Sequence, residues 1–195
     1  MLTPIRALAA LALIPVLQGC AGNARPMPPV AAVDLPRFMG DWYVIAHVPS
    51  PPEREAFDAV ESYRLDRDGR VRTTFTYRKG SHDAPLKTMR PTGFVRPGTG
   101  NAVWGMQFVW PIKAEYVIAY LDDDYTQTIV ARSKRDYAWI MARTPTLPEA
   151  EYRRLSQRLV ELGYRAESIR QVPQATAATA ASARPADTAG GDGSK

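Results

Sequence analysis

Few side chains in this chain of 195 residues are suited to covalent or metal chemistry. The sequence contains one cysteine, Cys20, and two histidines, His47 and His82. Neither histidine belongs to an arrangement that resembles a nucleophile, a base and an orienting residue, and a metal site would need imidazoles or thiols pointing into a pocket. We therefore expect no catalytic residue, no metal site, no cofactor and no enzymatic activity.

The cysteine lies at the end of an apolar stretch near the N-terminus. One positive charge, Arg6, precedes the apolar run 7–16, which is too short to span a bilayer and is typical of a signal peptide over residues 1–19. Residues 17–20 read Leu-Gln-Gly-Cys and resemble a bacterial lipobox, in which Cys20 is acylated and becomes the new N-terminus. Lipidation would also explain a single cysteine in an exported chain. The alternative is a chance cysteine beside an ordinary cleavage site.

Two further segments lack the pattern of a folded domain. Residues 20–33 carry the lipidation site and a proline-rich stretch, which we interpret as an extended tether of ~30–40 Å. Residues 173–195 are rich in alanine, threonine, serine and glycine, and we expect them to be disordered. The net charge of +5 comes from scattered basic residues rather than from a stripe, so we expect no nucleic-acid partner.

Between these segments, alternating apolar and polar residues mark roughly eight short strands separated by turns. The first convincing strand is 42–48 and the last is 136–143. We predict an all-β fold, an eight-stranded antiparallel up-and-down β-barrel, because an even number of strands brings the last strand beside the first. That closure would place the guanidinium of Arg143 over the indole of Trp42, a cation–π pair worth ~1–2 kcal/mol when shielded.

Three motifs follow one another in this region: Gly40-Asp41-Trp42 at the head of the first strand, an acidic turn at 122–125, and Arg143 at the end of the last strand. They resemble the three signature regions of the lipocalin family, which makes Gly40, Trp42, Asp122 and Arg143 structural residues. The run 136–146 is similar, more narrowly, to the bacterial lipocalins, which are outer-membrane lipoproteins related to apolipoprotein D. The resemblance covers residues 34–172 and implies a barrel with one C-terminal α-helix.

Alternation along the strands predicts which side chains face the lumen. In the first strand Val44 and Ala46 fall on the inner face with Trp42, and His47 falls on the outer face. Glu61 shares the parity of the inward residues of its strand, where it would bind a headgroup or pair with a tyrosine, unless a register slip leaves it in solvent. The expected ligand-binding residues are Val44, Ala46, Glu61, Tyr63, Phe75, Tyr77, Trp104, Met106, Phe108, Tyr116, Tyr137, Trp139 and Met141.

Large aromatic residues are concentrated on one face of the strand that begins at Trp104. Trp104, Phe108 and Trp110 are more large aromatic side chains on one face than a tightly filled small core needs. The face therefore either lines a cavity or forms an exposed patch for a partner or membrane. We favour the cavity. The loop 49–55 lies at the open end of the predicted barrel and is either a lid or a plain surface loop.

The C-terminal part of the domain has a helix signal. Thr146 is expected to cap a helix, and apolar residues recur at helical spacing from 152 to 162, so that this stripe would pack on the outside of the barrel. Ile169 and Val172 are expected to pair as a final short strand.

A closed barrel of this size with an aliphatic and aromatic wall can hold one small ligand. The resemblance implies a fatty acid or lysophospholipid, bound by a lipid-anchored protein that faces the periplasm at the bacterial outer membrane and stores or transports lipid. A homodimer is compatible with this interpretation. The alternative is an envelope protein-interaction module whose barrel is filled by its own side chains.

Overall fold

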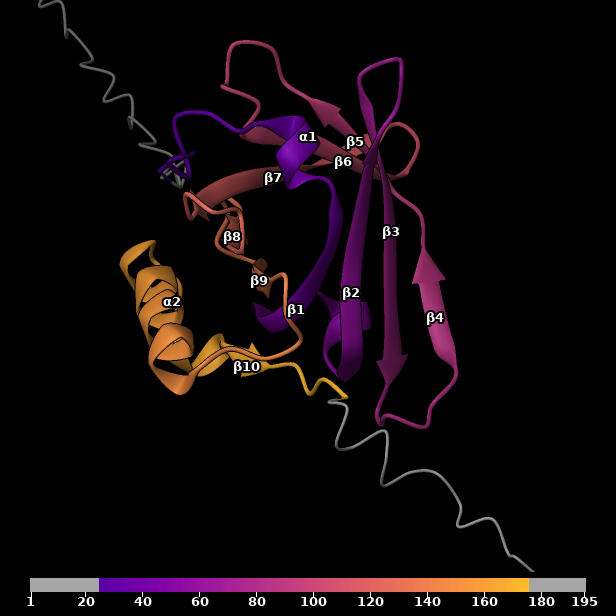
Figure 1. Cartoon of the computed structure of the whole chain (residues 1–195), viewed down its shortest axis with the longest axis vertical. Coiled ribbons are helices and arrows are strands. Elements are labelled where there is room, and N and C mark those ends of the chain that lie inside the picture. The colour runs from indigo at the N-terminus through magenta and orange to yellow at the C-terminus, as the bar shows by residue number, and fades with distance from the viewer. Residues whose placement is uncertain (1–24, 176–195) are drawn as a thin grey trace, which may run out of the picture.

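A computed structural model describes residues 25–175, and Figure 1 shows the arrangement of their helices and strands. The expected signal peptide (1–19), the lipidation site Cys20 and residues 176–195 of the C-terminal tail lie outside the described residues. The strands are β1 (Gly40–Val48), β2 (Ala56–Leu65), β3 (Arg70–Lys79), β4 (Leu86–Met89), β5 (Thr92–Val95), β6 (Val103–Val109), β7 (Ile112–Leu121), β8 (Gln127–Ala131), β9 (Ala138–Ala142) and β10 (Arg170–Gln171). The helices are α1 (Leu35–Phe38) and α2 (Glu149–Glu161), with short 3₁₀ turns at Pro51–Glu53 and Ala166–Ser168.

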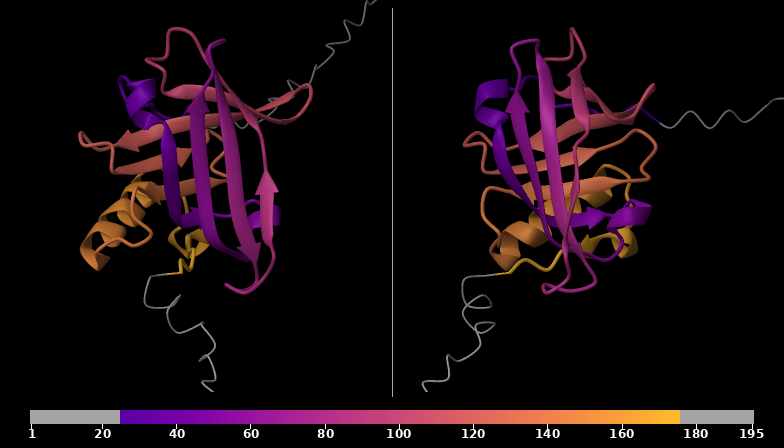
Figure 2. Two further views of the ribbon diagram at one scale, coloured as in Figure 1. Left: turned by 45° about the vertical axis from the view of Figure 1, so that its right-hand side comes forward. Right: turned by 90° about the vertical axis from the view of Figure 1, so that its right-hand side faces the viewer.

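Eight of these strands close into an antiparallel barrel. They pair in the order β1, β2, β3, β5, β6, β7, β8 and β9, and β9 then pairs with β1. The register of that last pair runs from Tyr43 opposite Ala142 to Val48 opposite Ala138. The predicted eight-stranded barrel is therefore correct. Figure 2 shows that β2 and β3 cross the strands β6–β9 at a steep angle, so the barrel consists of two crossing halves.

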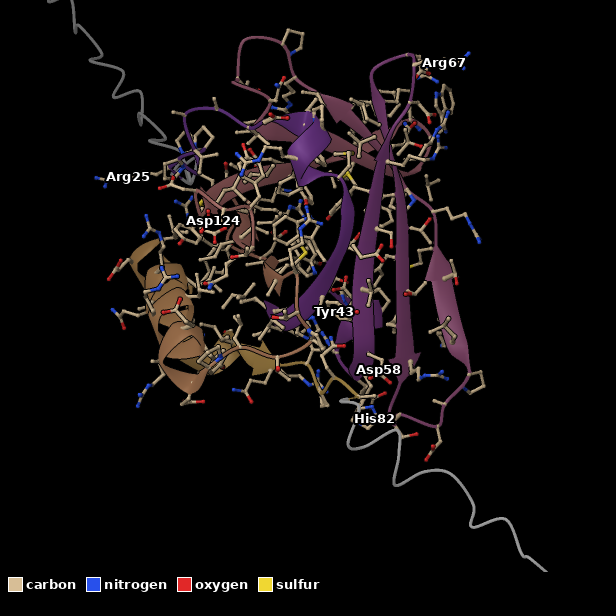
Figure 3. The ribbon with its side chains drawn as sticks, viewed as in Figure 1. Arg25, Tyr43, Asp58, Arg67, His82 and Asp124 are labelled. Atoms are coloured by element: carbon tan, nitrogen blue, oxygen red, sulfur yellow. The ribbon has the colours of Figure 1, made fainter. Side chains whose placement is uncertain are left out.

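The strand directions define two ends of the barrel. At the closed end lie α1, the start of β1 and the β2–β3, β5–β6 and β7–β8 turns. At the open end lie the β1–β2, β3–β4, β6–β7 and β8–β9 connections. Figure 3 shows the two ends of the β2–β3 hairpin, with Arg67 in its turn and with Asp58 and His82 at the opposite end.

The strand predicted over 86–95 is divided into β4 and β5, which both pair with β3. Pro91 lies between them and has no backbone N–H to donate, which favours an interruption of the ladder. Its carbonyl oxygen instead accepts a hydrogen bond from the backbone N–H of Thr73, at 3.1 Å. The predicted final strand is present as β10, which pairs with β1 at Ala46 and His47.

A β-bulge in β1 reverses the two faces of the strand beyond Val44. Val44 lies opposite Met141 on β9, but Ala46 lies opposite Ile140, so β1 advances by two residues where β9 advances by one. Ala46 therefore packs in the outer cluster rather than facing the lumen, and its prediction as a ligand-binding residue is wrong. His47 pairs with Trp139 and turns inward, contrary to the prediction.

Helix α2 covers the outside of the barrel beside β1, β8 and β9, as predicted (Figure 1). Leu155 and Leu159 are fully buried in this outer cluster. The helix begins at Glu149 after Pro148, and no side chain caps it, so Thr146 is not the cap that the sequence predicts. The carbonyl of Thr146 instead accepts a hydrogen bond from the hydroxyl of Thr144. Within residues 25–175, no helix is long and apolar enough to cross a membrane.

The N-terminal segment 25–33 packs along the barrel instead of forming the predicted free tether. The side chains of Met27 and Val33 are buried, and the backbone N–H of Val30 donates to the carbonyl of Ile118 at 2.9 Å. The segment runs from the β8–β9 loop at the open end, where the N–H of Met27 donates to Ser133, to the closed end, where Val33 contacts Gly100. At the other terminus, residues 173–175 contact β1 and β2 rather than lying free.

Candidate functional site

The closed end is held together by Arg143. Its guanidinium carbon lies 3.8 Å from the centroid of the Trp42 ring, so the predicted cation–π pair is present. The guanidinium also donates hydrogen bonds to the backbone carbonyls of Asp41 at 2.8 Å and Met39 at 2.9 Å. It donates as well to the carbonyls of Arg37, Phe38 and Tyr125. A planar group with five donors can satisfy several carbonyls at the end of α1 at once, which a lysine cannot do. This arrangement ties β9 to the start of β1.

The other signature residues support the same end. Asp122 accepts hydrogen bonds from the backbone N–H groups of Thr126 at 2.7 Å and Gln127 at 2.8 Å, and therefore stabilises the β7–β8 turn. Gly40 has a φ of 94°, a left-handed conformation that favours glycine, and a Cβ atom there would lie 3.4 Å from Arg143. Both residues have structural contacts, as the resemblance implied.

Aromatic side chains fill the lower part of the barrel and form a floor. Phe38 from α1 lies with its ring centroid 5.0 Å from that of Trp42 and 5.6 Å from those of Tyr63 and Trp104. The indole N–H of Trp104 donates to the carbonyl of Asn101 at the closed end. Stacking of Trp104 on Tyr116, at 4.9 Å, completes the layer. This part of the lumen has no room for a ligand because the protein's own rings occupy it.

Above this floor lies a cavity of about 280 Å³, close to the lower end of the ~300–1,000 Å³ typical of small-molecule sites. Its wall comes from strands on both halves of the barrel and from the β1–β2 connection at the open end. The lining residues are Ser50, Pro51, Pro52, Glu53, Glu61, Tyr63, Phe75, Met89, Met106, Phe108, Ala114, Glu115, Tyr116, Arg132, Tyr137, Trp139 and Met141.

Most residues of the predicted binding set are brought together at this cavity. Those that line it are Glu61, Tyr63, Phe75, Met106, Phe108, Tyr116, Tyr137, Trp139 and Met141. Val44, Tyr77 and Trp104 face the inner core but do not line the cavity, because neighbouring core side chains pack against them; Tyr77, for example, stacks on Phe75 at 5.1 Å. Ala46 is on the outer face, for the reason given above.

Sequence reasoning missed the contribution of the β1–β2 connection. Glu53 is buried there and accepts hydrogen bonds from the Trp139 indole N–H at 2.8 Å and from the Ser50 hydroxyl at 2.5 Å. His47 lies 3.5 Å from the same carboxylate because the bulge turns it inward. A buried glutamate in a proline-rich loop has no signal in the sequence alone. Whether the loop moves as a lid stays a prediction.

The carboxyl of Glu61 is the most perturbed acid of the cavity wall. Burial raises its pKa well above the ordinary value, and the negative charge of Glu53 raises it further. Its Oε2 atom is shielded from solvent and has no hydrogen-bond partner. The inward orientation thus holds, and the alternative of a solvent-exposed Glu61 does not. Both effects favour the protonated form of this carboxyl, which has one O–H to donate.

Two tyrosine hydroxyls continue this polar strip between the two halves of the barrel. The hydroxyls of Tyr63 and Tyr116 lie 2.7 Å apart and share a hydrogen bond. Burial raises the pKa of both phenols well above the ordinary value, and the nearby Glu61 adds to this effect. The interior therefore offers neutral hydrogen-bonding groups in a mostly apolar wall.

A positive charge lies at the open end of the cavity. The guanidinium of Arg132 lies 5.1 Å from the Tyr137 ring centroid and 3.4 Å from Asp136, and its Nε atom is buried without a hydrogen-bond partner. Tyr164 supports this loop, since its hydroxyl accepts from the N–H of Arg132 and donates to the carbonyl of Tyr137. Sequence reasoning missed Arg132, which lies one residue beyond β8 and outside its alternating pattern.

The described residues contain few other side chains suited to catalysis or metal binding. His82 bonds to the carboxylate of Asp58 at 3.0 Å at the open end, where it contacts Phe57 rather than the cavity (Figure 3). Within residues 25–175, histidine and acidic side chains form no group of three that could hold a metal ion.

Comparison with known sequences identifies relatives across most of the chain. Residues 33–174 match the lipocalin-like domain. Temperature-induced lipocalin-1 of Arabidopsis thaliana is 26% identical over 182 residues, covering 85% of this chain and 92% of the relative. Outer membrane lipoprotein Blc of Vibrio cholerae is 26% identical over 136 residues, covering 68% and 77%. The protein of that name from Citrobacter freundii is 30% identical over 130 residues, covering 64% and 72%.

Solved structures agree on the fold. Apocrustacyanin C2 superimposes with a TM-score of 0.59 at 12% identity, covering 77% of this chain and 91% of the other. Insecticyanin from the tobacco hornworm Manduca sexta superimposes with a TM-score of 0.59 at 15% identity, covering 78% and 86%. Lipocalins generally bind or transport small hydrophobic ligands rather than catalyse reactions. With a closed barrel, a Trp42–Arg143 pair at its closed end and a domain match over 33–174, this chain belongs to the lipocalin family.

Proposed function

We propose that this protein is a membrane-anchored lipocalin that holds a fatty acid or lysophospholipid in its barrel for lipid storage or transport in the bacterial cell envelope. The observation that carries the proposal is the cavity of about 280 Å³ between the aromatic floor and the open end. Its wall is mainly aliphatic and aromatic. Burial of an alkyl chain inside it would therefore contribute a favourable free energy of ~25 cal/mol per Å² of apolar surface removed from water. The cavity argues against the alternative of a barrel filled by its own side chains.

The distribution of charge favours one orientation of such a ligand. The interior lies close to the negative charge of Glu53, which would repel a carboxylate or phosphate inserted head first. Arg132 lies at the open end with an unpartnered Nε atom. The acyl chain therefore enters first, and the anionic headgroup stays beside Arg132. Neutral Glu61 and the tyrosine pair can donate hydrogen bonds to an ester or hydroxyl oxygen of the ligand.

Anchoring at the periplasmic face of the outer membrane completes the proposal. Residues 17–20 resemble a lipobox, and relatives from Vibrio cholerae and Citrobacter freundii are named outer membrane lipoproteins. Labelled palmitate should be incorporated into the protein in a Gram-negative host and lost in Cys20→Ser. Incorporation that survives this substitution would contradict the anchor.

Displacement of a fluorescent fatty acid from the chain 20–195 carrying Cys20→Ser tests ligand binding. Palmitate should displace the probe from a saturable site. Ala114→Trp fills the cavity and should weaken probe binding at least tenfold, whereas the control Lys113→Trp, on the exposed outer side of the same strand, should leave it unchanged. Circular dichroism of each variant checks the fold. Absence of saturable binding, or equal binding by both variants, would reject the proposal.

The orientation has its own test in a neutral ligand of equal chain length. Arg132→Gln should weaken palmitate but not 1-hexadecanol, because only the carboxylate is attracted by the guanidinium. Equal loss for both ligands would show that Arg132 acts through packing and would contradict the placement of the headgroup.

A further inference from the structure

The tip of the β6–β7 hairpin exposes a continuous group of large apolar side chains. Phe108 is 55% exposed, Val109 69%, Trp110 82% and Ile112 70%. Within residues 25–175, the remaining exposed large apolar side chain is Leu86, at 54% on β4. Water contact with four adjacent apolar side chains is unfavourable, and such patches on soluble domains mark surfaces that bind a partner or a membrane. We name residues 108–112 the apolar tip.

A bulge at the end of β6 sets the orientation of the apolar tip. Met106 lies opposite Ala114, but Val109 lies opposite Ile112, so β6 has one residue more than β7 in this interval. Beyond the bulge both strands carry their apolar side chains into solvent rather than into the barrel. Figure 2 shows this hairpin projecting beyond the neighbouring strands.

The apolar tip adjoins the mouth of the cavity. Phe108 belongs to both, since it lines the cavity and is half exposed. Trp110 does not line the cavity, and neither does Ile112. A surface that contacted these side chains would therefore meet the opening through which a ligand has to pass.

Two exposed lysines lie at the same end of the barrel as the apolar tip. Lys113 follows it on β7 and Lys134 lies in the β8–β9 loop, and both are exposed. The nearby carboxylates of Glu115 and Asp136 are engaged by Ser133 and Arg132. Tryptophan beside lysine is a composition enriched at the boundary between lipid headgroups and acyl chains, where the indole is partly wet. Anionic headgroups would complement the lysines.

The course of the N-terminal segment points to the same end. Arg25 is the first described residue, and its carbonyl accepts a hydrogen bond from Arg135 in the β8–β9 loop. In the right panel of Figure 2 the start of the described chain lies at the same end of the strands β6–β9 as the hairpin. Cys20 precedes Arg25 by five positions, a reach of at most roughly 18 Å. This step rests on the proposed anchor, and it keeps the open end close to the bilayer.

We propose that the apolar tip inserts into the headgroup region of a phospholipid bilayer, so that the open end of the barrel docks on the membrane surface. The occupant is the lipid surface itself, because an interface that is partly wet suits an exposed indole at an end of the barrel that also carries exposed lysines. Docking would let an acyl chain pass between bilayer and cavity without crossing open water. Membrane docking by this hairpin goes beyond ligand binding in the barrel and can fail independently of it.

Vesicle flotation tests the docking with the chain 20–195 carrying Cys20→Ser, which keeps every described residue and removes the acylation site. Vesicles of phosphatidylethanolamine and phosphatidylglycerol should carry the protein to the top of the gradient. The tip variant, which combines Trp110→Ser with Ile112→Ser, should have a partition coefficient between vesicles and water at least tenfold lower than that of the parent. The matched control Leu86→Ser removes an exposed apolar side chain from β4 and should change it less than twofold.

Tryptophan fluorescence adds a readout that a general loss of stability would not produce. Trp110 is largely exposed, whereas Trp42 and Trp104 are buried, so vesicles should shift the emission to the blue. Trp110→Phe should keep flotation but lose most of that shift. Absence of flotation, equal flotation of the tip variant, or a shift that survives Trp110→Phe would each overturn the proposal. Self-association through the tip without vesicle binding, seen by size-exclusion chromatography, would also overturn it.

Ligand displacement on the same variants separates this proposal from the proposed function. The tip variant should bind palmitate as the parent does, because neither substituted residue lines the cavity. Loss of vesicle docking with palmitate binding intact supports the tip as a membrane contact. Failure of the parent to bind palmitate would reject the proposed ligand. Membrane docking by the apolar tip would still be tested by the flotation result.

Discussion

Replacing Glu61 by glutamine should stabilise the barrel at neutral pH. Burial and the charge of Glu53 raise the pKa of Glu61 in the folded protein, whereas in the unfolded chain the carboxyl titrates near its ordinary value. From that value upward, the folded state keeps a proton that the unfolded state has released. The free energy of unfolding therefore falls by about 1.4 kcal/mol per pH unit as the pH rises from the pKa of Glu61 in the unfolded chain to its raised pKa in the folded protein. Glutamine does not titrate, and this loss disappears.

Urea unfolding followed by tryptophan fluorescence measures the effect over a pH series from about 4 to about 8. Parent and Glu61→Gln should have similar free energies of unfolding at the acidic end, where Glu61 is protonated in both states. The advantage of the variant should then grow with pH. Glu149→Gln, in the exposed first turn of α2, controls for the removal of one carboxyl and should leave the profile unchanged. Parallel profiles for parent and Glu61→Gln would refute the assignment of a neutral buried carboxyl.

Three further predictions concern the frame that positions the cavity. Arg143→Ala should lower the free energy of unfolding by about 2–4 kcal/mol, because the cation–π pair and several charge-assisted hydrogen bonds are lost together; denaturant unfolding checks this, and full recovery by Arg143→Lys would contradict the role of the planar fork. Leu159→Ala should lower the free energy of unfolding by about 2–5 kcal/mol by leaving a cavity under α2, while palmitate displacement stays unchanged. A parallel loss of palmitate affinity would contradict the separation of the outer cluster under α2 from the lumen. Met27→Ala should weaken the docked N-terminal segment by about 1.5–3 kcal/mol and accelerate proteolysis within 25–33, and an unchanged cleavage rate would argue against its packing.

Strand alternation allowed much of the site to be predicted where one face of the sheet is solvated. Along β3, Val71, Thr73, Phe75 and Tyr77 are buried and the intervening residues are more exposed, so parity alone identified the inward side chains. The Trp42–Arg143 contact could be predicted for a different reason. Closure of an even number of antiparallel strands leaves the ends of the first and last strands adjacent, whatever the detailed packing.

The same reasoning failed where other parts of the chain cover the barrel. Along β1, Ile45, Ala46 and Val48 are buried against the cluster around α2, and Val44 is buried inside, so hydrophobicity does not distinguish the two faces. A bulge adds one residue without a mark in composition, and it moved Ala46 outward and His47 inward.

The sequence by itself determined that eight strands form the barrel, that the barrel closes and that its wall is apolar, because these follow from local alternation and chain order. Tertiary structure alone decided where the lumen stays open. The position of the cavity depends on Phe38 filling the floor from α1, on the β1–β2 connection bringing Glu53 against Trp139, and on Arg132 standing at the rim. These contacts join residues far apart in the chain, and packing between them, rather than any local pattern, sets the volume left for a ligand.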